Sequence, residues 1–177
     1  MKISNIKTWL AVIFLIFLEQ GIKIIINNNF LDRHIPIVPP LLYFDPMFNR
    51  DYSWFNSMLN LNIGKGLHVF VAAVMIIFIY LVYRYLNKRL GNRKAVNFMF
   101  AFLFSGAVCS LLDKVLWNGS LDYILVDGYF TFDLKDVYID IFIGLMILMM
   151  LIKREAFKTL DDKELMRDFI RFVFRRS

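Results

Sequence analysis

Acidic residues stand within or beside the longest apolar segments of this sequence, which is an unusual place for charge. Glu19 and Lys23 lie one helical turn apart in the first such segment, and Asp113 is near the end of a later one. Asp122 and Asp136 follow shortly after it. A charge inside a bilayer costs at least about 2.5 kcal/mol, so in a membrane protein each of these groups needs a partner or a function.

Paired carboxyl groups are the chemistry that these acids favour. Two carboxylates held close together cannot both ionise at low cost, so one keeps its proton while the other takes a proton from water, as in aspartic peptidases. That reaction needs no metal, cofactor or nucleophilic side chain. His34 and His68 stand far apart, Cys109 is the single cysteine, and no Gly-x-Ser-x-Gly segment marks a serine nucleophile. Composition and spacing alone do not decide which acids pair.

The composition indicates a membrane protein. Hydrophobic residues make up 59% of the chain and charged residues 20%, whereas soluble domains have about 45–50% and about 25%. A water-soluble fold is therefore close to excluded, and the single cysteine excludes an internal disulfide. The net charge of +6 fits cytoplasmic loops beside anionic membrane lipids better than a nucleic-acid partner.

Four segments are long and apolar enough to cross a bilayer, which takes roughly 20 helical residues. They are Thr8–Ile26, Gly66–Leu86, Val96–Leu116 and Val137–Ile152. We expect the first to be retained, because Glu19-Gln20 stands where a signal peptide would need small residues for cleavage. The sequence thus predicts an all-α membrane protein with four transmembrane helices, forming one domain over residues 1–152.

Basic residues in the connections set the predicted orientation, because Lys and Arg concentrate on the cytoplasmic side. Basic residues and no acid stand at the end of the second segment and in the connection to the third: Arg84, Lys88, Arg89, Arg93 and Lys94. The tail, residues 153–177, carries eight basic residues against five acidic ones. Both termini are therefore expected in the cytoplasm. The tail itself is either a basic amphipathic helix on the inner membrane surface or a solvated end.

The two connections expected outside, about residues 27–65 and 117–135, are too long for simple turns. Leu41–Phe44 is rich in β-forming residues. Tyr123–Val126 and Tyr129–Phe132 flank an Asp-Gly pair, the pattern of a hairpin with a type I′ turn. We therefore expect a small β-rich extracytoplasmic cap. In this topology the acids gather at the outer membrane boundary, which is the candidate active site.

Five short motifs occur at these positions. Ser105–Lys114 is similar to the pattern Gly-Gly-x-x-Gly-Asn-x-x-Asp-Arg, Leu121–Tyr123 to Val-Asp-Phe, and Phe132–Asp136 to Phe-Asn-x-Ala-Asp. Upstream, Glu19–Lys23 is similar to Asp-Gln-x-x-Lys and Asn49–Phe55 to Asn-x-Gly-x-Ala-Phe. In their order along the chain, the motifs resemble those of the lipoprotein signal peptidase family, signal peptidase II, whose members are four-helix membrane aspartic peptidases. The resemblance covers nearly the whole chain except its tail.

The resemblance implies that Asp122 and Asp136 form the catalytic pair. It places Asn49 and Ser110 against the substrate backbone. The other supporting residues that it implies are Asp113 with Lys114 at a helix end, Asp133, and Glu19 with Lys23 as a brace of the helix bundle. The implied reaction is cleavage of lipidated prolipoproteins before a diacylglyceryl-modified cysteine. The expected enzyme is a monomer in the bacterial cytoplasmic membrane, with its active site on the extracytoplasmic side.

Several residues depart from the family pattern: Glu19 replaces an aspartate, Ser110 an asparagine, Lys114 an arginine, Asp133 an asparagine and Lys135 an alanine. Lys114 keeps the charge but lacks the planar fork of arginine. Asp133 adds negative charge beside the pair, which raises the pKa of a neighbouring carboxyl unless Lys135 or Lys114 compensates. The chain is therefore expected to be a divergent member.

Other interpretations stay open from the residues alone. One is a catalytically inactive relative that binds lipopeptides, and another is a small proton-coupled membrane transporter that uses the acids as a relay. A third makes Asp133, Asp136 and Asp140 the oxygen ligands of a metal. Outside catalysis, Asp136 is a helix N-terminal acid and Asp122 a solvated hairpin residue.

Overall fold

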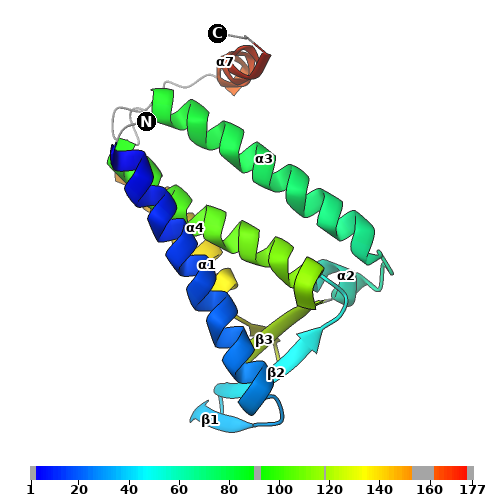
Figure 1. Ribbon diagram of the computed structural model, residues 1–177. Coiled ribbons are helices and arrows are strands. Elements are labelled where there is room, and N and C mark those ends of the chain that lie inside the picture. The colour runs from blue at the N-terminus through cyan, green and yellow to red at the C-terminus, as the bar shows by residue number, and fades with distance from the viewer. Residues whose placement is uncertain (1–2, 90–92, 118, 153–161, 175–177) are drawn as a thin grey trace.

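The computed structural model describes residues 3–89, 93–117, 119–152 and 162–174. Its long helices are α1, Ile3–Asn29, α3, Lys65–Arg89, α4, Arg93–Leu112, and α5, Leu134–Ile152 (Figure 1). The shorter ones are α2, Trp54–Leu59, the π-helical turn η1, Asp113–Trp117, which continues α4, and α7, Asp162–Phe174. A helix is therefore present at each of the four predicted apolar segments.

Among the described residues, three helical stretches are long and apolar enough to cross a membrane: Ile6–Asn29, Lys65–Arg89 and Lys94–Trp117. α5 is not among them, and Lys135, Asp136 and Asp140 place charges in its first two turns. Large apolar side chains are exposed along α1 and α3. A lipid environment accounts for this exposure, because a soluble protein rarely leaves so large an apolar surface in water.

The central helix is α4, which packs against α1, α3 and α5. Its buried side chains Val96, Phe100 and Phe104 form a core with Val12 of α1 and Tyr83 of α3. Aromatic rings pack edge to face in this core; for example, the ring centroids of Tyr83 and Phe104 lie 5.7 Å apart. This packing carries the end of α4, and η1 after it, to the end of the bundle where the sheet lies.

A four-stranded antiparallel sheet lies at one end of the helices (Figure 1). Its strands, in spatial order, are β1, Ile35–Val38, β2, Leu42–Asn49, β3, Ser120–Val126, and β4, Phe130–Phe132. The predicted β-rich segments are thus confirmed, and the two long connections form one sheet because β2 pairs with β3. Leu121 and Tyr123 of β3 pack against Ile26, which attaches the sheet to the end of α1.

The hairpin of β3 and β4 forms as the sequence indicates, but its turn is not the predicted type I′. Tyr129 N donates to the Val126 carbonyl oxygen at 2.9 Å, which closes the turn around Asp127 and Gly128. Gly128 has a φ of 75°, whereas Asp127 is not among the described residues with positive φ. Only the second central residue is left-handed, as in a type II turn, so the predicted turn type was wrong.

Helix α7 lies in the tail that is predicted to be amphipathic. The ring centroid of Tyr85 on α3 lies 5.4 Å from that of Phe169 and 5.7 Å from that of Phe172. Arg89 of α3 pairs with Asp168 at 3.4 Å. Apolar side chains of α7 therefore contact α3. The remainder of the predicted tail, residues 153–161 and 175–177, lies outside the described residues.

Close packing of α4 on α5 depends on Gly106. A Cβ atom at this position would lie 2.7 Å from Ile139 Cγ1 and 3.0 Å from the carbonyl oxygen of Lys135. The first of these separations is shorter than packed atoms tolerate, so only glycine lets the two helices approach this closely. Because Lys135 and Asp136 lie in the first turn of α5, the same approach sets the position of both residues at the site.

Gly106→Ala is expected to push α5 from α4 and to lower the free energy of unfolding by about 1–3 kcal/mol, because it overpacks the helix contact. Gly144→Ala on α5 is the matched control, since a Cβ there meets nothing within 4 Å. Thermal unfolding of the two purified variants measures the difference. Equal unfolding temperatures would show that the close approach does not matter.

Candidate active site

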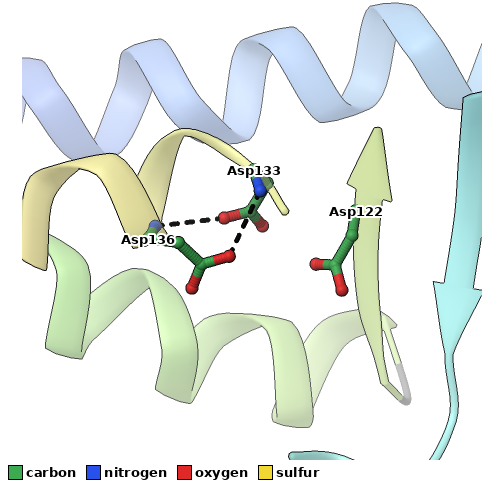
Figure 2. Close-up of side chains that lie close together, drawn as sticks. All are labelled: Asp122, Asp133 and Asp136. Atoms are coloured by element: carbon green, nitrogen blue, oxygen red, sulfur yellow. Dashed lines mark hydrogen bonds between the residues drawn. The ribbon is translucent and has the colours of Figure 1, made fainter. Parts of the chain in front are cut away.

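Three aspartates converge where the sheet meets the start of α5 (Figure 2). Asp122 extends from β3, while Asp133 and Asp136 stand at the beginning of α5. One carboxylate oxygen of each lies within 4.8 Å of the other two. Figure 2 shows the carboxyl groups of Asp122 and Asp136 facing each other. The side chain of Asp136 is 42% exposed and that of Asp122 10%, so Asp136 is the more accessible member.

Asp133 and Asp136 cap the first turn of α5 reciprocally. Asp136 N donates to Asp133 Oδ1 at 3.3 Å, and Asp133 N donates to Asp136 Oδ2 at 3.2 Å. This is the pattern of a capping box, which satisfies backbone donors at a helix start and restrains both side chains. The interpretation of Asp136 as a helix N-terminal acid therefore describes part of its role, and the cap also orients its carboxyl group.

Asp122 shares one face of β3 with Ser120, because alternate residues of a strand point the same way. The Ser120 hydroxyl lies 2.6 Å from Asp122 Oδ1 and 3.1 Å from Asp113 Oδ2, and its one hydrogen serves a single acceptor at a time. Lys135 Nζ lies 3.2 Å from Asp122 Oδ1. Sequence reasoning missed Ser120; extending the predicted strand back from Tyr123 would have shown its two-residue spacing to Asp122.

Lys23, a buried lysine of α1, forms ion pairs with three buried acids. Lys23 Nζ lies 3.1 Å from Glu19 Oε1, 2.5 Å from Asp113 Oδ2 and 2.7 Å from Asp133 Oδ2, and all four side chains are fully buried. The predicted pair of Glu19 and Lys23 is present. The same ammonium also reaches η1 and the start of α5, so it connects three separate elements.

Tyr123 makes a second connection between these elements, from the face of β3 opposite to Asp122. Its hydroxyl donates to Glu19 Oε2 at 3.2 Å and accepts from Leu134 N at 3.1 Å. Desolvation and the nearby carboxylates of Glu19 and Asp133 raise the pKa of the Tyr123 phenol, so it remains a hydrogen-bond donor. Hydrogen bonds therefore link α1 through β3 to the first residue of α5.

The surrounding charges give the three aspartates different proton affinities. Desolvation raises the pKa of Asp122, although Lys135 opposes it. Asp136, which precedes the apolar part of α5, has its pKa raised to about 7 by desolvation and the Asp133 carboxylate, again against Lys135. Desolvation acts on Asp133 as well, but Lys135 and Lys23 outweigh it and hold its pKa at about 2. Asp133 is thus ionised near neutral pH, while Asp136 is protonated below about pH 7.

A cavity of about 520 Å³ opens between α3, α4 and α5. Its apolar lining comes from all three helices and includes Leu67, Val71, Met75, Leu103, Ala107 and Ile139. Ser110 and Lys114 also line it, and Lys114 Nζ donates to Ser110 Oγ at 2.8 Å. Lys114 interacts electrostatically with Asp136. Two predicted supporting residues therefore lie on a cavity wall close to the acids.

The other two predicted supporting residues of this group, Asn49 and Asp113, have partners within the protein. Asn49 is the last residue of β2, and its Oδ1 accepts from Asp51 N at 3.1 Å, the contact of a loop cap. Asp113 forms its ion pairs with Lys23 of α1 and Lys135 of α5, whereas its neighbour Lys114 acts on it only through longer-range electrostatics. Spacing along one helix end predicted the local pair, whereas the helix packing supplies a partner from another element.

The family model and the relatives identified by sequence agree on one family. The family described as Signal peptidase (SPase) II matches residues 11–152. Proteins named lipoprotein signal peptidase from Brucella ovis and Brucella canis are each 29% identical over 143 residues, covering 78% of this chain and 85% of the relative. A solved structure described as a bacterial membrane enzyme, determined by the in meso method at 2.3 Å resolution, has a TM-score of 0.67 at 19% identity, covering 88% of this chain and 93% of that chain.

A second solved structure with the same description, at 1.9 Å resolution, has a TM-score of 0.66 at 19% identity and covers 82% of this chain and 92% of that chain. These structural likenesses show a shared fold. The family match and the named relatives define the chain as an aspartic-type membrane peptidase. Within that class, the chain belongs to the signal peptidase II family, as its motifs predict.

Lys23→Met is expected to lower the free energy of unfolding by about 3–5 kcal/mol, because it leaves Glu19, Asp113 and Asp133 buried with a missing counter-charge. Lys7→Met is the matched control, since Lys7 is an exposed lysine of the same helix. Thermal unfolding of the purified proteins compares the two variants. An unfolding temperature of Lys23→Met equal to that of the control would contradict the bracing role of the Lys23 ammonium.

Proposed function

We propose that the chain is a membrane endopeptidase that removes the signal peptide of lipid-modified prolipoproteins, with Asp122 and Asp136 as its catalytic acids. The observation that carries the proposal is that these two carboxyl groups, from β3 and α5, face each other with oxygens within 4.8 Å (Figure 2). Membership of the signal peptidase II family supports the substrate class. The curated relatives are named for the same activity.

A pair of acids with one proton between them is suited to hydrolyse a peptide bond. The ionised acid takes a proton from water, the water oxygen bonds to the scissile carbonyl carbon, and the other acid gives its proton to the carbonyl oxygen. The gem-diol then collapses. The C–N bond breaks as the first acid returns a proton to the nitrogen, and the second acid recovers its proton from a gem-diol hydroxyl.

The cavity between α3, α4 and α5 supports a lipidated substrate. Its apolar walls suit acyl chains or the apolar part of a signal peptide, which then remain out of water. Ser110 and Lys114 on its wall offer hydrogen bonds to a peptide backbone. Asp136 is partly exposed, so a scissile carbonyl can reach the acids.

Three carboxylates meet at a spacing that a metal ion could use, but a lysine ammonium lies among them. The cluster consists of Asp122, Asp133 and Asp136, while Asp140 is exposed one turn further along α5. Lys135 Nζ lies 3.2 Å from Asp122 Oδ1 and 3.8 Å from Asp136 Oδ2, and it contacts Asp133. A protein ammonium therefore supplies the positive charge that a metal ion would otherwise bring, which favours the peptidase over the metal site.

We further propose that residues 1–152 form one domain that spans the bacterial cytoplasmic membrane four times, with Val137–Ile152 of α5 as the fourth span. The sheet then caps the extracytoplasmic side, where the acids lie at the membrane boundary. In Figure 1 the sheet and α7 lie at opposite ends of α3, which supports a cytoplasmic tail when the sheet lies outside. The proposed unit is a monomer surrounded by membrane lipids.

Asp122→Asn and Asp136→Asn are each expected to slow cleavage of a lipidated prolipoprotein by about 10²–10⁴-fold, because an amide neither accepts nor donates the required proton. Asp140→Asn, an exposed acid one turn beyond Asp136, is the matched control and retains the wild-type rate. Release of the signal peptide by purified protein in liposomes, followed by mass spectrometry, measures the rates. Full activity of either dyad variant removes the catalytic assignment.

The value of kcat/KM is expected to fall as the pH rises above about 7. The pKa of Asp136 is raised to about 7, so its proton is present below that pH and lost above it. Once both acids are ionised, neither can protonate the scissile carbonyl, and kcat/KM decreases by about tenfold per pH unit. The same cleavage assay between about pH 5 and pH 9 measures this. A constant kcat/KM up to pH 9 contradicts the expected proton donor.

A further inference from the structure

Lys135 lies among the acids, although the chemistry of a carboxyl pair does not itself require a lysine. Its Nζ lies 2.7 Å from Ser120 Oγ, 3.2 Å from Asp122 Oδ1 and 3.8 Å from Asp136 Oδ2, and it contacts Asp133 Oδ2. The side chain is only 8% exposed. Burial of an unpaired ammonium costs several kcal/mol, so these acids hold the Lys135 ammonium in place.

The contacts of Lys135 with the two proposed catalytic acids are unequal. Asp122 Oδ1 accepts hydrogen bonds from both Lys135 and Ser120, and such donors stabilise an ionised carboxylate. Asp136 Oδ2 lies beyond hydrogen-bond distance of the ammonium and accepts from the backbone N of Asp133 instead. The pair is thus asymmetric before any substrate binds.

Lys135 also neutralises the third carboxylate beside the pair. Asp133 is fully buried and contacts Lys135 and Lys23 through the same oxygen. Without these cations, its negative charge would favour protonation of both neighbouring acids. The charged groups that act around Lys135 come from every element packed there: Glu19 and Lys23 of α1, Asp113 and Lys114 of η1, Asp122 of β3, and Asp133 and Asp136 at the start of α5.

We propose that Lys135 is a positioning residue that makes the acid pair unequal: its ammonium holds Asp122 ionised, as the base that deprotonates water, and leaves Asp136 as the acid. In the first step the water proton moves to Asp122, the water oxygen bonds to the carbonyl carbon, and the Asp136 proton moves to the carbonyl oxygen. This inference rests on the proposed function, because it divides the reaction between the two acids named there.

Three variants separate positioning from a structural role. Asp133→Asn with Lys135→Ala removes one buried charge of each sign, so the net charge of the cluster is unchanged while Asp122 loses its ammonium partner. Asp133→Asn alone keeps the ammonium and removes a negative charge. Lys135→Arg keeps the positive charge. Thermal unfolding of the double variant within a few degrees of the wild type then shows that the fold is retained.

The measurement is the titration of Asp122 by infrared spectroscopy of the purified full-length protein, with its carboxyl band assigned by its loss in Asp122→Asn. The double variant is expected to raise the titration midpoint of Asp122 by about one pH unit or more, because the nearest positive charge and a hydrogen-bond donor are gone. Asp133→Asn alone is expected to lower it, and Lys135→Arg to leave it near the wild-type value.

The pH dependence of kcat is expected to change among the variants in the same way as the Asp122 titration midpoint. The acid limb of kcat is expected to move with the Asp122 midpoint, while KM changes by less than about threefold, since the substrate contacts are unaffected. A double variant with the wild-type Asp122 midpoint overturns the role of Lys135. Failure of the wild type to cleave a lipidated prolipoprotein would instead contradict the proposed function, and the infrared titration still decides the role of Lys135.

Discussion

The end of the helix bundle that holds the acids depends on one constraint, the compensation of buried charge. Carboxyl groups from four elements meet there, and the ammonium groups of Lys23 and Lys135 lie between them. Removing a charge from water costs several kcal/mol unless an opposite charge and hydrogen bonds replace the solvent. The elements α1, η1, β3 and α5 must therefore meet in one arrangement for any of these charges to be buried. Helix packing and the sheet supply that arrangement.

The same contacts that stabilise the fold also prepare the acids for chemistry. The reciprocal cap of Asp133 and Asp136 begins α5 and aims the Asp136 carboxyl group at the site. Ser120 and Lys135 orient Asp122 opposite to it. Asp133 is held ionised by the lysines, whereas Asp136 is protonated below about pH 7. A structural and a catalytic task therefore fall on the same side chains, and the family membership of the chain is consistent with both.

Local patterns predicted the helices, the β-rich segments and the family, because apolar length and short motifs are properties of neighbouring residues. They did not predict which distant surfaces meet. The pairing of β2 with β3, and the contact of Lys23 with Asp113 in place of Lys114, both depend on the packing of separate elements. The turn at Asp127 was predicted wrongly because Asp-Gly fits more than one turn type, and the twist of the strands does not appear in the sequence.

An experimental structure with a non-hydrolysable lipidated propeptide, crystallised in a lipid phase, tests the central claim most directly. The account predicts that the group replacing the scissile carbonyl lies within hydrogen-bond reach, about 2.6–3.2 Å, of both Asp122 and Asp136. Lys135 is predicted to remain on Asp122 in that complex. A propeptide whose scissile group lies away from both acids, or acids whose oxygens point apart around it, would contradict the account.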